Sequence, residues 1–455
     1  MNPNIFREYD IRGIVDEDLH DNDVVRVGKG VGTYLRKENY SRIVVGRDCR
    51  LSSGRYRDLL IEGLVSTGCQ VVDIGVCPTP VFYFAIREEK MEGGVMITAS
   101  HNPPEYNGFK LCSGYDTLFG EQIRQLRRII ADGDFAEGSG DVAVVDPIPA
   151  YRRFVEKNIR ISNPLRVGVD AGNGTAGVVA VPILKALGCE VHDIYCEMDG
   201  RFPHHEADPT VTENMQDLIA LVRANDLLVG IGYDGDGDRI GVVDETGTIV
   251  WGDQLMIIYA REILSRKPGS TIISEVKSSQ TLYDDIEKHG GRPLMWKTGH
   301  SLIKQKMKEV DAALAGEMSG HMFFADRYFG YDDAVYASCR LLEILATTGK
   351  TLSELLADVP PVYNTPEIRV PCPDERKFQV VEDVRDYFRQ RRPIIDVDGV
   401  RVLFDEGWGL VRASNTQPVL VLRFEAYSER ALEQIRAEVE TVLHDMTQRN
   451  RTSCG

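Results

Sequence analysis

The sequence predicts an α/β protein built from three similar units and a smaller α+β domain at its C-terminal end. Three segments far apart in the chain each begin with an apolar, β-rich run that ends in polar or glycine residues and leads into a helical pattern. The last part of the chain instead groups several strand patterns with two helical ones. A chain of 455 residues also exceeds what one hydrophobic core usually serves, which indicates about three or four domains.

The three units open at 42–48, 165–174 and 271–278. Helical patterns follow at 55–67, 177–187 and 279–289, and further strands at 69–74 and 190–194 come after the first two. Strands that alternate with helices in this way predict mixed, mostly parallel sheets that are covered by helices on both faces.

The last part of the chain has extended patterns at 363–371, 399–404, 408–413 and 419–426, and helical patterns at 377–390 and 429–446. Clusters of proline, glycine and charged residues mark the limits between the predicted domains. These domains cover residues 1–145, 146–247, 248–360 and 361–455.

The composition argues against several classes of partner. The chain has 53 lysines and arginines against 70 aspartates and glutamates, and the net charge of −17 disfavours a nucleic acid or an anionic membrane surface. Neither a signal-peptide pattern nor a run of roughly eighteen apolar residues is found. The nine cysteines lack Cys-x-x-Cys spacing, which indicates reduced thiols and not a disulfide or zinc framework. We therefore expect a cytoplasmic protein.

Three aspartates spaced by two, Asp234, Asp236 and Asp238, follow the apolar run 227–233. They emerge at the end of a predicted strand, where the ligands of open α/β sheets collect. Extended residues spaced by two point to one side, and the glycines between them allow the loop to curl until the carboxylates converge on one ion. Hard oxygen ligands favour magnesium, manganese or calcium over zinc.

Other interpretations of this loop remain open. An EF-hand is disfavoured because position 6 of its loop, which needs glycine, is Arg239, and because the flanking runs are typical of strands. A solvated acidic turn is a second alternative. A third is an aspartyl-phosphate enzyme, in which an Asp-x-Asp pair supplies the nucleophile.

Ser100 follows the apolar run 94–97 and precedes His101, Asn102 and two prolines, which predicts a rigid, exposed turn. Taken alone, this turn is better explained by capping and surface hydrogen bonds. Beside a cage of carboxylates, its hydroxyl suits phosphorylation. A phosphoserine carries about −1.5 to −2 charge, so it tolerates three aspartates only with a divalent cation between them. The two loops together indicate a phosphoryl-transfer site.

Two further loops carry side chains that suit a sugar phosphate. The loop 316–321 offers Glu317, Ser319 and His321 as hydrogen-bond partners for hydroxyls. The loop 412–418 combines Arg412 with hydroxyls, amides and backbone N–H groups, which suits a phosphate dianion. Each loop taken alone also fits an ordinary polar turn.

Together, the four loops resemble the motifs of the α-D-phosphohexomutase superfamily, and most closely those of its bacterial phosphomannomutase/phosphoglucomutase members. Thr-Ala-Ser-His-Asn-Pro resembles the phosphoserine loop, Asp-Gly-Asp-Gly-Asp-Arg the magnesium loop, Gly-Glu-Met-Ser-Gly-His the sugar loop and Arg-Ala-Ser-Asn-Thr the phosphate loop. The motifs stand in the family's order over nearly the whole chain. The resemblance implies four domains around a central cleft, three with a shared mixed α/β topology and a mobile, smaller fourth that closes over substrate.

The resemblance also implies roles for individual residues. Ser100 would be phosphorylated, and Mg²⁺ would be held by that phosphate and by Asp234, Asp236 and Asp238. The phosphoserine would be flanked by Arg12, His101 and Lys110, with Lys110 a candidate for proton transfer. Sugar hydroxyls would contact Glu317 and Ser319. The cleft would be lined by Tyr9, Arg239, Lys277, His300 and His321, and the phosphate that is not transferred would be held by Arg412, Ser414, Asn415 and Thr416.

The chemistry implied by the resemblance is reversible movement of phosphate between O1 and O6 of mannose or glucose. It runs through a phosphoserine enzyme and a hexose 1,6-bisphosphate, with glucose 1,6-bisphosphate as activator. We expect a monomer whose partners are hexose phosphates. Alternatives are a phosphoglucosamine mutase, a metal-dependent sugar-phosphate phosphatase and a non-catalytic phosphosugar sensor. The sensor is the least supported, because binding alone needs no serine beside three aspartates.

Overall fold

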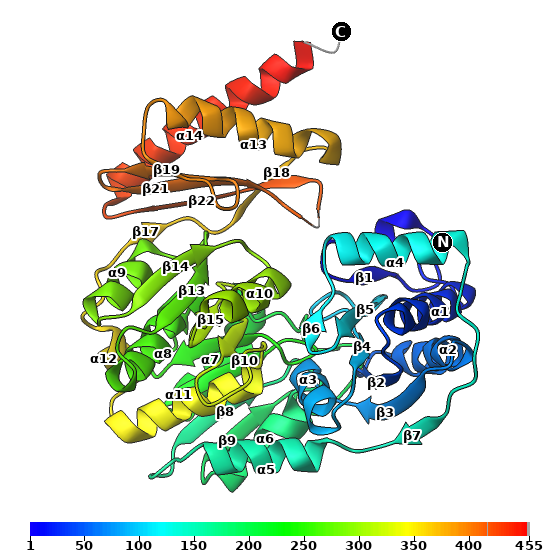
Figure 1. Ribbon diagram of the computed structural model, residues 1–455. Helices are drawn as coiled ribbons and strands as arrows, with labels where there is room; N and C mark the ends of the chain where they lie inside the picture. Colours follow the sequence, from blue (N-terminus) through cyan, green and yellow to red (C-terminus); the bar gives the residue numbers. More distant parts are fainter. Residues whose placement is uncertain (416, 453–455) are drawn as a thin grey trace.

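The computed structural model describes residues 1–415 and 417–452 and arranges them in four sheets, each covered by its own helices (Figure 1). The predicted α/β class is confirmed. The domain limits drawn from the sequence stay predictions, and the second sheet extends to Val250, past the limit predicted at 247. Among the described residues, none of the helices combines the length and the apolar character that crossing a bilayer requires.

The first sheet has the strand order β1-β5-β4-β2-β3-β7, and β6 pairs with β5. Its strands are β1 (Ile11–Ile14), β2 (Arg42–Arg47), β3 (Gln70–Val76), β4 (Gly93–Ile97), β5 (Tyr106–Ser113), β6 (Asp116–Thr117) and β7 (Val142–Val144). The helices of this part are η1 (Pro3–Ile5), α1 (Asp21–Lys37), α2 (Ser53–Ser66), α3 (Thr79–Glu88) and α4 (Glu121–Asp132).

The second sheet has the order β12-β11-β10-β8-β9 and the third β14-β13-β15-β16. The second part contains α5 (Ile148–Asn158), β8 (Arg166–Asp170), α6 (Gly177–Ala186), β9 (Glu190–Ile194), η2 (Thr212–Met215), α7 (Gln216–Ala224), β10 (Val229–Tyr233), β11 (Ile240–Asp244) and β12 (Ile249–Val250). The third contains α8 (Gly252–Arg266), β13 (Thr271–Glu275), α9 (Gln280–Lys288), β14 (Arg292–Trp296), α10 (His300–Val310), β15 (Leu314–Gly316), β16 (Met322–Phe324), α11 (Ala334–Thr348) and α12 (Leu352–Leu356).

The fourth sheet has the order β17-β22-β21-β20-β19, and β18 pairs with β22. Two helices pack on it, as the sequence predicts for an α+β domain. The elements are β17 (Tyr363–Asn364), β18 (Ile368–Pro371), α13 (Asp374–Arg389), β19 (Ile394–Ile395), β20 (Val400–Phe404), β21 (Gly407–Ala413), β22 (Val419–Ala426) and α14 (Glu429–Thr452).

The first three sheets repeat one arrangement of four strands. In each unit the first strand lies between the second and the third, all three run parallel, and the fourth pairs antiparallel with the third. The three sets are β5-β4-β2-β3, β11-β10-β8-β9 and β16-β15-β13-β14. The predicted repeat is therefore confirmed. Each unit also places one hairpin loop, between its third and fourth strands, at the same point of its sheet.

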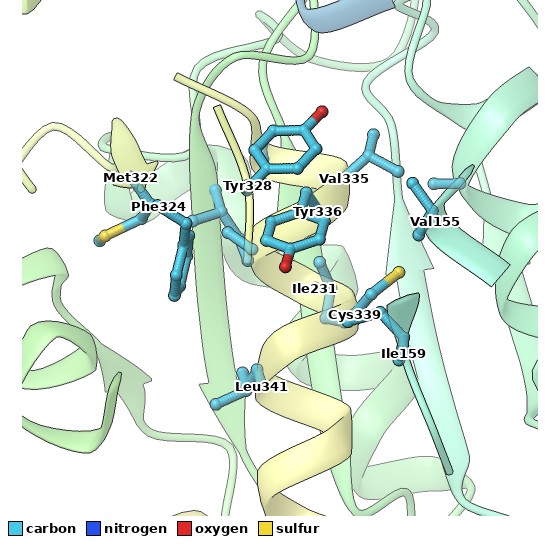
Figure 2. Close-up of a cluster of buried hydrophobic side chains, with 14 of the residues drawn as sticks. Val155, Ile159, Ile231, Met322, Phe324, Tyr328, Val335, Tyr336, Cys339 and Leu341 are labelled. Carbon is cyan, nitrogen blue, oxygen red and sulfur yellow. The ribbon is translucent and has the colours of Figure 1, made fainter. Parts of the chain in front are cut away.

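The first three domains share one hydrophobic core, the first domain has a second core within its own sheet and helices, and the core of the fourth domain is separate. One cluster of buried side chains runs from Phe82 on α3 through Ile231 on β10 to the third domain. Figure 2 shows part of this cluster, in which the Tyr328 and Tyr336 rings stack with centroids 4.0 Å apart and to which Val155 of α5 also belongs. The core of the fourth domain is a separate cluster between its sheet and its two helices.

A buried carboxylate, Asp333, sits in this shared core and caps α11. It accepts hydrogen bonds from the Tyr336 N–H at 2.8 Å and from the Tyr151 and Tyr328 hydroxyls at 2.9 and 2.5 Å. Burial raises the pKa of Asp333 to about 7, although these three donors work in the opposite direction. Since Tyr151 belongs to α5, the carboxylate also joins the second domain to the third.

This raised pKa predicts how stability depends on pH. Between 3.8 and about 7, folded Asp333 holds a proton that the unfolded chain releases, so its contribution makes stability fall as pH rises and is constant above that window. Asp333→Asn removes this titration. We expect the difference in melting temperature, variant minus wild type, to increase as the pH rises through this window. The underlying change in the free energy of unfolding is at most about 1.4 kcal/mol per pH unit. Asp132→Asn, at the exposed last position of α4, is the control. A constant difference across the window would contradict the prediction.

Candidate active site

Ser100 lies in the hairpin loop between β4 and β5, and the three aspartates lie in the equivalent loop between β10 and β11. The Ser100 hydroxyl donates to Asp234 Oδ2 at 2.7 Å and lies 3.1 Å from His101 Nδ1. Its backbone is left-handed, with φ at 50°, and a non-glycine residue holds that conformation only where its surroundings enforce it. A Cβ on Gly235 would approach Ser100 O to 2.5 Å, so glycine is needed for the two loops to touch.

The aspartate carboxylates form a site that fits a metal ion. Asp234, Asp236 and Asp238 are each fully buried, and their oxygens lie within 4.8 Å of one another. Asp236 Oδ1 and Asp238 Oδ1 lack a hydrogen-bond partner among the described residues. Burial and the two neighbouring carboxylates raise the pKa of Asp234 well above its usual value. A hard divalent cation would supply the missing positive charge and ligand contacts.

Lys110 supplies part of that positive charge from the first domain. Its ammonium, on β5, donates to Asp236 Oδ2 at 2.7 Å and to Asp238 Oδ2. Burial alone would lower the pKa of Lys110, but the carboxylates raise it, and the lysine in turn lowers the pKa of Asp236. Lys110 is therefore charged in this arrangement, and it could accept a proton only after leaving the aspartates.

A second group of side chains aligns Arg239 beside the aspartates. The Arg239 Nε–H donates to His321 Nε2 at 3.0 Å, so the ring proton of neutral His321 lies on Nδ1. That atom faces Asp332 Oδ2 at 3.3 Å and Asp238 Oδ1 at 3.6 Å. The His321 ring also stacks on His300, with centroids 5.6 Å apart. Asp332 thus places a buried carboxylate beside a predicted cleft residue.

Arg12 and His101 lie beside the Ser100 loop. The Arg12 guanidinium, on β1, donates to Asn102 Oδ1 at 2.6 Å and pairs with Asp10 at 2.5 Å. Burial and the nearby cations, Arg239 foremost and Arg12 next, lower the pKa of His101 well below its usual value. The imidazole beside the Ser100 hydroxyl is therefore neutral.

The loop 316–321 is the third equivalent hairpin loop, between β15 and β16. Glu317 Oε1 accepts from the Gly299 N–H at 2.8 Å, and burial, followed by the charge of Glu275, raises the pKa of Glu317. Ser319 is half-buried in the same loop. Lys277 lies after β13, with its ammonium 3.1 Å from Glu367 and 3.5 Å from Glu275.

The loop after β21 brings the fourth domain to the site. The Asn415 amide donates to the Tyr9 hydroxyl at 2.8 Å, and that hydroxyl donates to Thr298 O at 3.1 Å. Tyr9 thus contacts the third and fourth domains from the first, and its ring lies 5.9 Å from that of His300. Arg412 pairs with Asp398 at 3.1 Å, and buried Ser414 accepts from the Gln417 N–H at 3.2 Å. Thr416 lies outside the described residues.

The sequence analysis missed several side chains that support these residues, namely Glu275, Asp332, Asp398 and the Asp48–Arg50 pair. Glu275 accepts from the Met318 N–H at 3.0 Å and from the Thr298 hydroxyl at 2.5 Å. Asp398 accepts from the Thr298 N–H at 3.0 Å. A signal for two of them existed, since Asp48 and Glu275 end or follow the first strand of their units.

Four family models of known proteins match consecutive parts of the chain. The family models for phosphoglucomutase/phosphomannomutase alpha/beta/alpha domains I, II and III match residues 3–137, 149–247 and 251–363, and the model for the C-terminal domain matches residues 367–442.

Individual relatives cover nearly the whole chain. The chain is 48% identical to a phosphomannomutase/phosphoglucomutase of Pseudomonas aeruginosa, over 95% of this chain and 94% of the relative. It is 43% identical to a phosphoglucomutase of Neisseria gonorrhoeae, over 96% of both. A crystal structure of a phosphoglucomutase/phosphomannomutase family protein from Burkholderia thailandensis superimposes with a TM-score of 0.94 at 40% identity and covers 98% of both chains. The chain therefore belongs to the phosphoglucomutase/phosphomannomutase family.

Proposed function

We propose that the protein is a phosphomannomutase/phosphoglucomutase, which moves phosphate reversibly between O1 and O6 of mannose and glucose. The names of the relatives from Pseudomonas aeruginosa and Neisseria gonorrhoeae support this activity. The observation that carries it in this chain is the hydrogen bond of the Ser100 hydroxyl to Asp234, within a triad of buried carboxylates. That contact puts a candidate phosphate carrier beside a candidate metal site.

The proposed reaction uses Ser100 as the phosphate carrier. Phosphorylated Ser100 transfers its phosphoryl group to a substrate hydroxyl, which loses its proton as the O–P bond forms, while the serine oxygen regains a proton. The hexose 1,6-bisphosphate then reorients in the site without leaving it. Its other phosphoryl group is transferred to Ser100, which restores the phosphorylated protein. Neutral His101, 3.1 Å from the Ser100 oxygen, is placed to hold a proton there. Glucose 1,6-bisphosphate would act as activator by phosphorylating Ser100.

The charged residues around Ser100 would stabilise the transferring group. Lys110 and Arg239 lie on the aspartate side, and Arg12 lies near Asn102. Bound Mg²⁺, held by Asp234, Asp236 and Asp238, would neutralise charge that builds on the phosphoryl oxygens.

The sugar and its second phosphate would be held by the other loops. Glu317 and Ser319 would contact hydroxyls, while Arg412, Ser414 and Asn415 would hold the phosphate that is not transferred. One chain supplies all of these groups, which supports a monomer.

The test is phosphorus NMR of the protein with Mg²⁺, a trace of glucose 1,6-bisphosphate and one sugar 1-phosphate at a time. Mannose 1-phosphate and glucose 1-phosphate should each convert to the 6-phosphate without release of inorganic phosphate. Release of inorganic phosphate would replace the proposal with a sugar-phosphate phosphatase. Conversion of glucosamine 1-phosphate alone would replace it with a phosphoglucosamine mutase.

Ser100→Ala tests the phosphate carrier. We expect turnover to fall by on the order of 10⁴-fold or more, because the substituted chain has no oxygen to carry the phosphoryl group. Binding of glucose 1-phosphate, measured by calorimetry, should change little. The wild-type protein should gain the mass of one phosphate after exposure to glucose 1,6-bisphosphate, and the variant should gain none. Ser265→Ala, at an exposed position near the end of α8, is the matched control. Wild-type turnover in Ser100→Ala would remove this residue from the mechanism.

Asp238→Asn tests the metal site without an activity assay. The affinity for Mn²⁺, measured by electron paramagnetic resonance, should fall by more than roughly 10-fold. Mutation of a residue that only supports a metal ligand already lowers metal affinity by about that factor. Asp58→Asn, at an exposed position of α2, should bind Mn²⁺ as wild type does. Equal affinity in the Asp238 variant would show that the ion binds elsewhere.

A further inference from the structure

Arg50 lies directly behind the Ser100 loop and is only 2% exposed. One terminal nitrogen of its guanidinium donates to Pro103 O at 2.6 Å and Tyr106 O at 3.1 Å. The other donates to Ser100 O at 2.9 Å and Asn102 O at 2.5 Å. A single side chain thus binds three carbonyl oxygens of the loop that carries Ser100 and one at the start of β5.

The guanidinium is itself held in place. Arg50 Nε donates to Asp48 Oδ2 at 3.1 Å, and Asp48 Oδ1 accepts from the Arg50 N–H at 3.0 Å and the Ser53 hydroxyl at 2.6 Å. The Asn107 amide, from β5, donates to the Ser53 hydroxyl at 3.0 Å. A buried network therefore joins the end of β2, the start of α2 and the strand that carries Lys110.

The second domain covers this network. The Phe202 ring centroid lies 5.1 Å from the Arg50 guanidinium carbon. A Cβ on Gly200 would approach Cys49 O to 2.4 Å and Arg50 Cα to 2.8 Å, so glycine lets the covering loop lie directly on the chain at Arg50. Arg50 is enclosed by both domains, and its guanidinium donates only to four backbone carbonyls and to Asp48, which leaves it no access to a sugar.

Resting on the proposed function, we propose that Arg50 is a positioning residue for phosphoryl transfer, which holds the Ser100 loop in its strained form and stabilises its phosphorylated state. Ser100 has φ at 50°, and such a conformation persists only where the surroundings over-determine it. Phosphorylation adds about −1.5 to −2 charge to a loop whose carbonyl oxygens accept hydrogen bonds from Arg50. The guanidinium balances that charge from behind, and its planar fork can serve several acceptors at once.

The third domain uses a related arrangement, which supports this assignment independently. Glu275, at the end of β13, accepts from the Met318 N–H and so holds the loop of Glu317 and Ser319. Asp48 follows β2, the strand equivalent to β13, but its carboxylate reaches the Ser100 loop only through Arg50. In both units an acidic residue at the end of the first strand supports the loop after the third.

Arg50→Lys tests the inference, because lysine keeps the charge but offers no planar fork for the four carbonyls. We expect kcat for glucose 1-phosphate to fall roughly 10²-fold, the cost of a misplacement of about 1 Å, with little change in KM. We also expect phosphorylated protein, freed of glucose 1,6-bisphosphate and followed by intact mass, to lose its phosphate faster than wild type. Arg55→Lys, a partly exposed arginine of α2, should match wild type in all three measurements.

The outcomes separate the inference from the proposed function. If the wild type is active and Arg50→Lys has the same kcat and the same rate of phosphate loss, the inference alone is overturned. If the wild type shows no mutase turnover, both the inference and the proposed function are overturned. The inference would also be overturned if the fall in kcat equals the fall in the fraction of folded protein and the phosphorylated variant keeps its phosphate as long as wild type does. If Arg50→Lys does not fold by circular dichroism, Asp48→Asn, which leaves Arg50 present but removes its anchoring charge, is judged by the same criteria.

Discussion

Three carboxylates, those of Asp234, Asp236 and Asp238, are buried together without any exposed surface, and the rest of the site depends on compensating them. Removing an ionised group from water costs several kcal/mol unless countercharge and hydrogen bonds replace the solvent. Here the compensation comes partly from another domain, since Lys110 on β5 reaches the carboxylates of the second domain. Its effect is incomplete, because oxygens of Asp236 and Asp238 still lack partners among the described residues. The ion pairs of Lys110 therefore join two domains, and the negative charge that they leave uncompensated favours the binding of a cation.

The repeated topology explains why these groups meet. In each of the first three units, the loop between the third and fourth strands carries a predicted motif, and each loop touches the next. Ser100 in the first bonds to Asp234 in the second, and Ile240, just after the second loop, donates its N–H to Gly320 O in the third at 3.0 Å. Three different loops at the same topological position of three sheets thus lie next to one another and form one site.

The sequence was sufficient for the repeat, for the strand before each motif and for the position of each motif in a loop, because these are local signals: apolar runs, glycine spacing and polar residues at strand ends. It was insufficient for the supporting residues. Asp332 acts on His321 and Glu275 acts on Met318, and nothing near either acid in the sequence names its partner. Lys110 was predicted for proton transfer, but its pairing with two aspartates depends on how two sheets are packed, which no periodicity within one strand can reveal.

The fourth domain joins the rest through a different balance of forces. Its core is separate, and the small buried apolar cluster that it shares with the third domain consists of Val276, Trp408 and Leu410. Directional contacts accompany this cluster: buried Arg401 donates to Val276 O at 2.9 Å, and Asn415 donates to Tyr9. A hydrogen bond exchanged for water changes stability by only about 1 kcal/mol, so such contacts can be made and broken at modest cost, unlike the shared core of the first three domains. Movement of this domain stays a prediction. Its physical requirement is an interface with less apolar burial than the cores on either side, and the small size of this cluster, near the loop that we propose to hold a phosphate, agrees with that requirement.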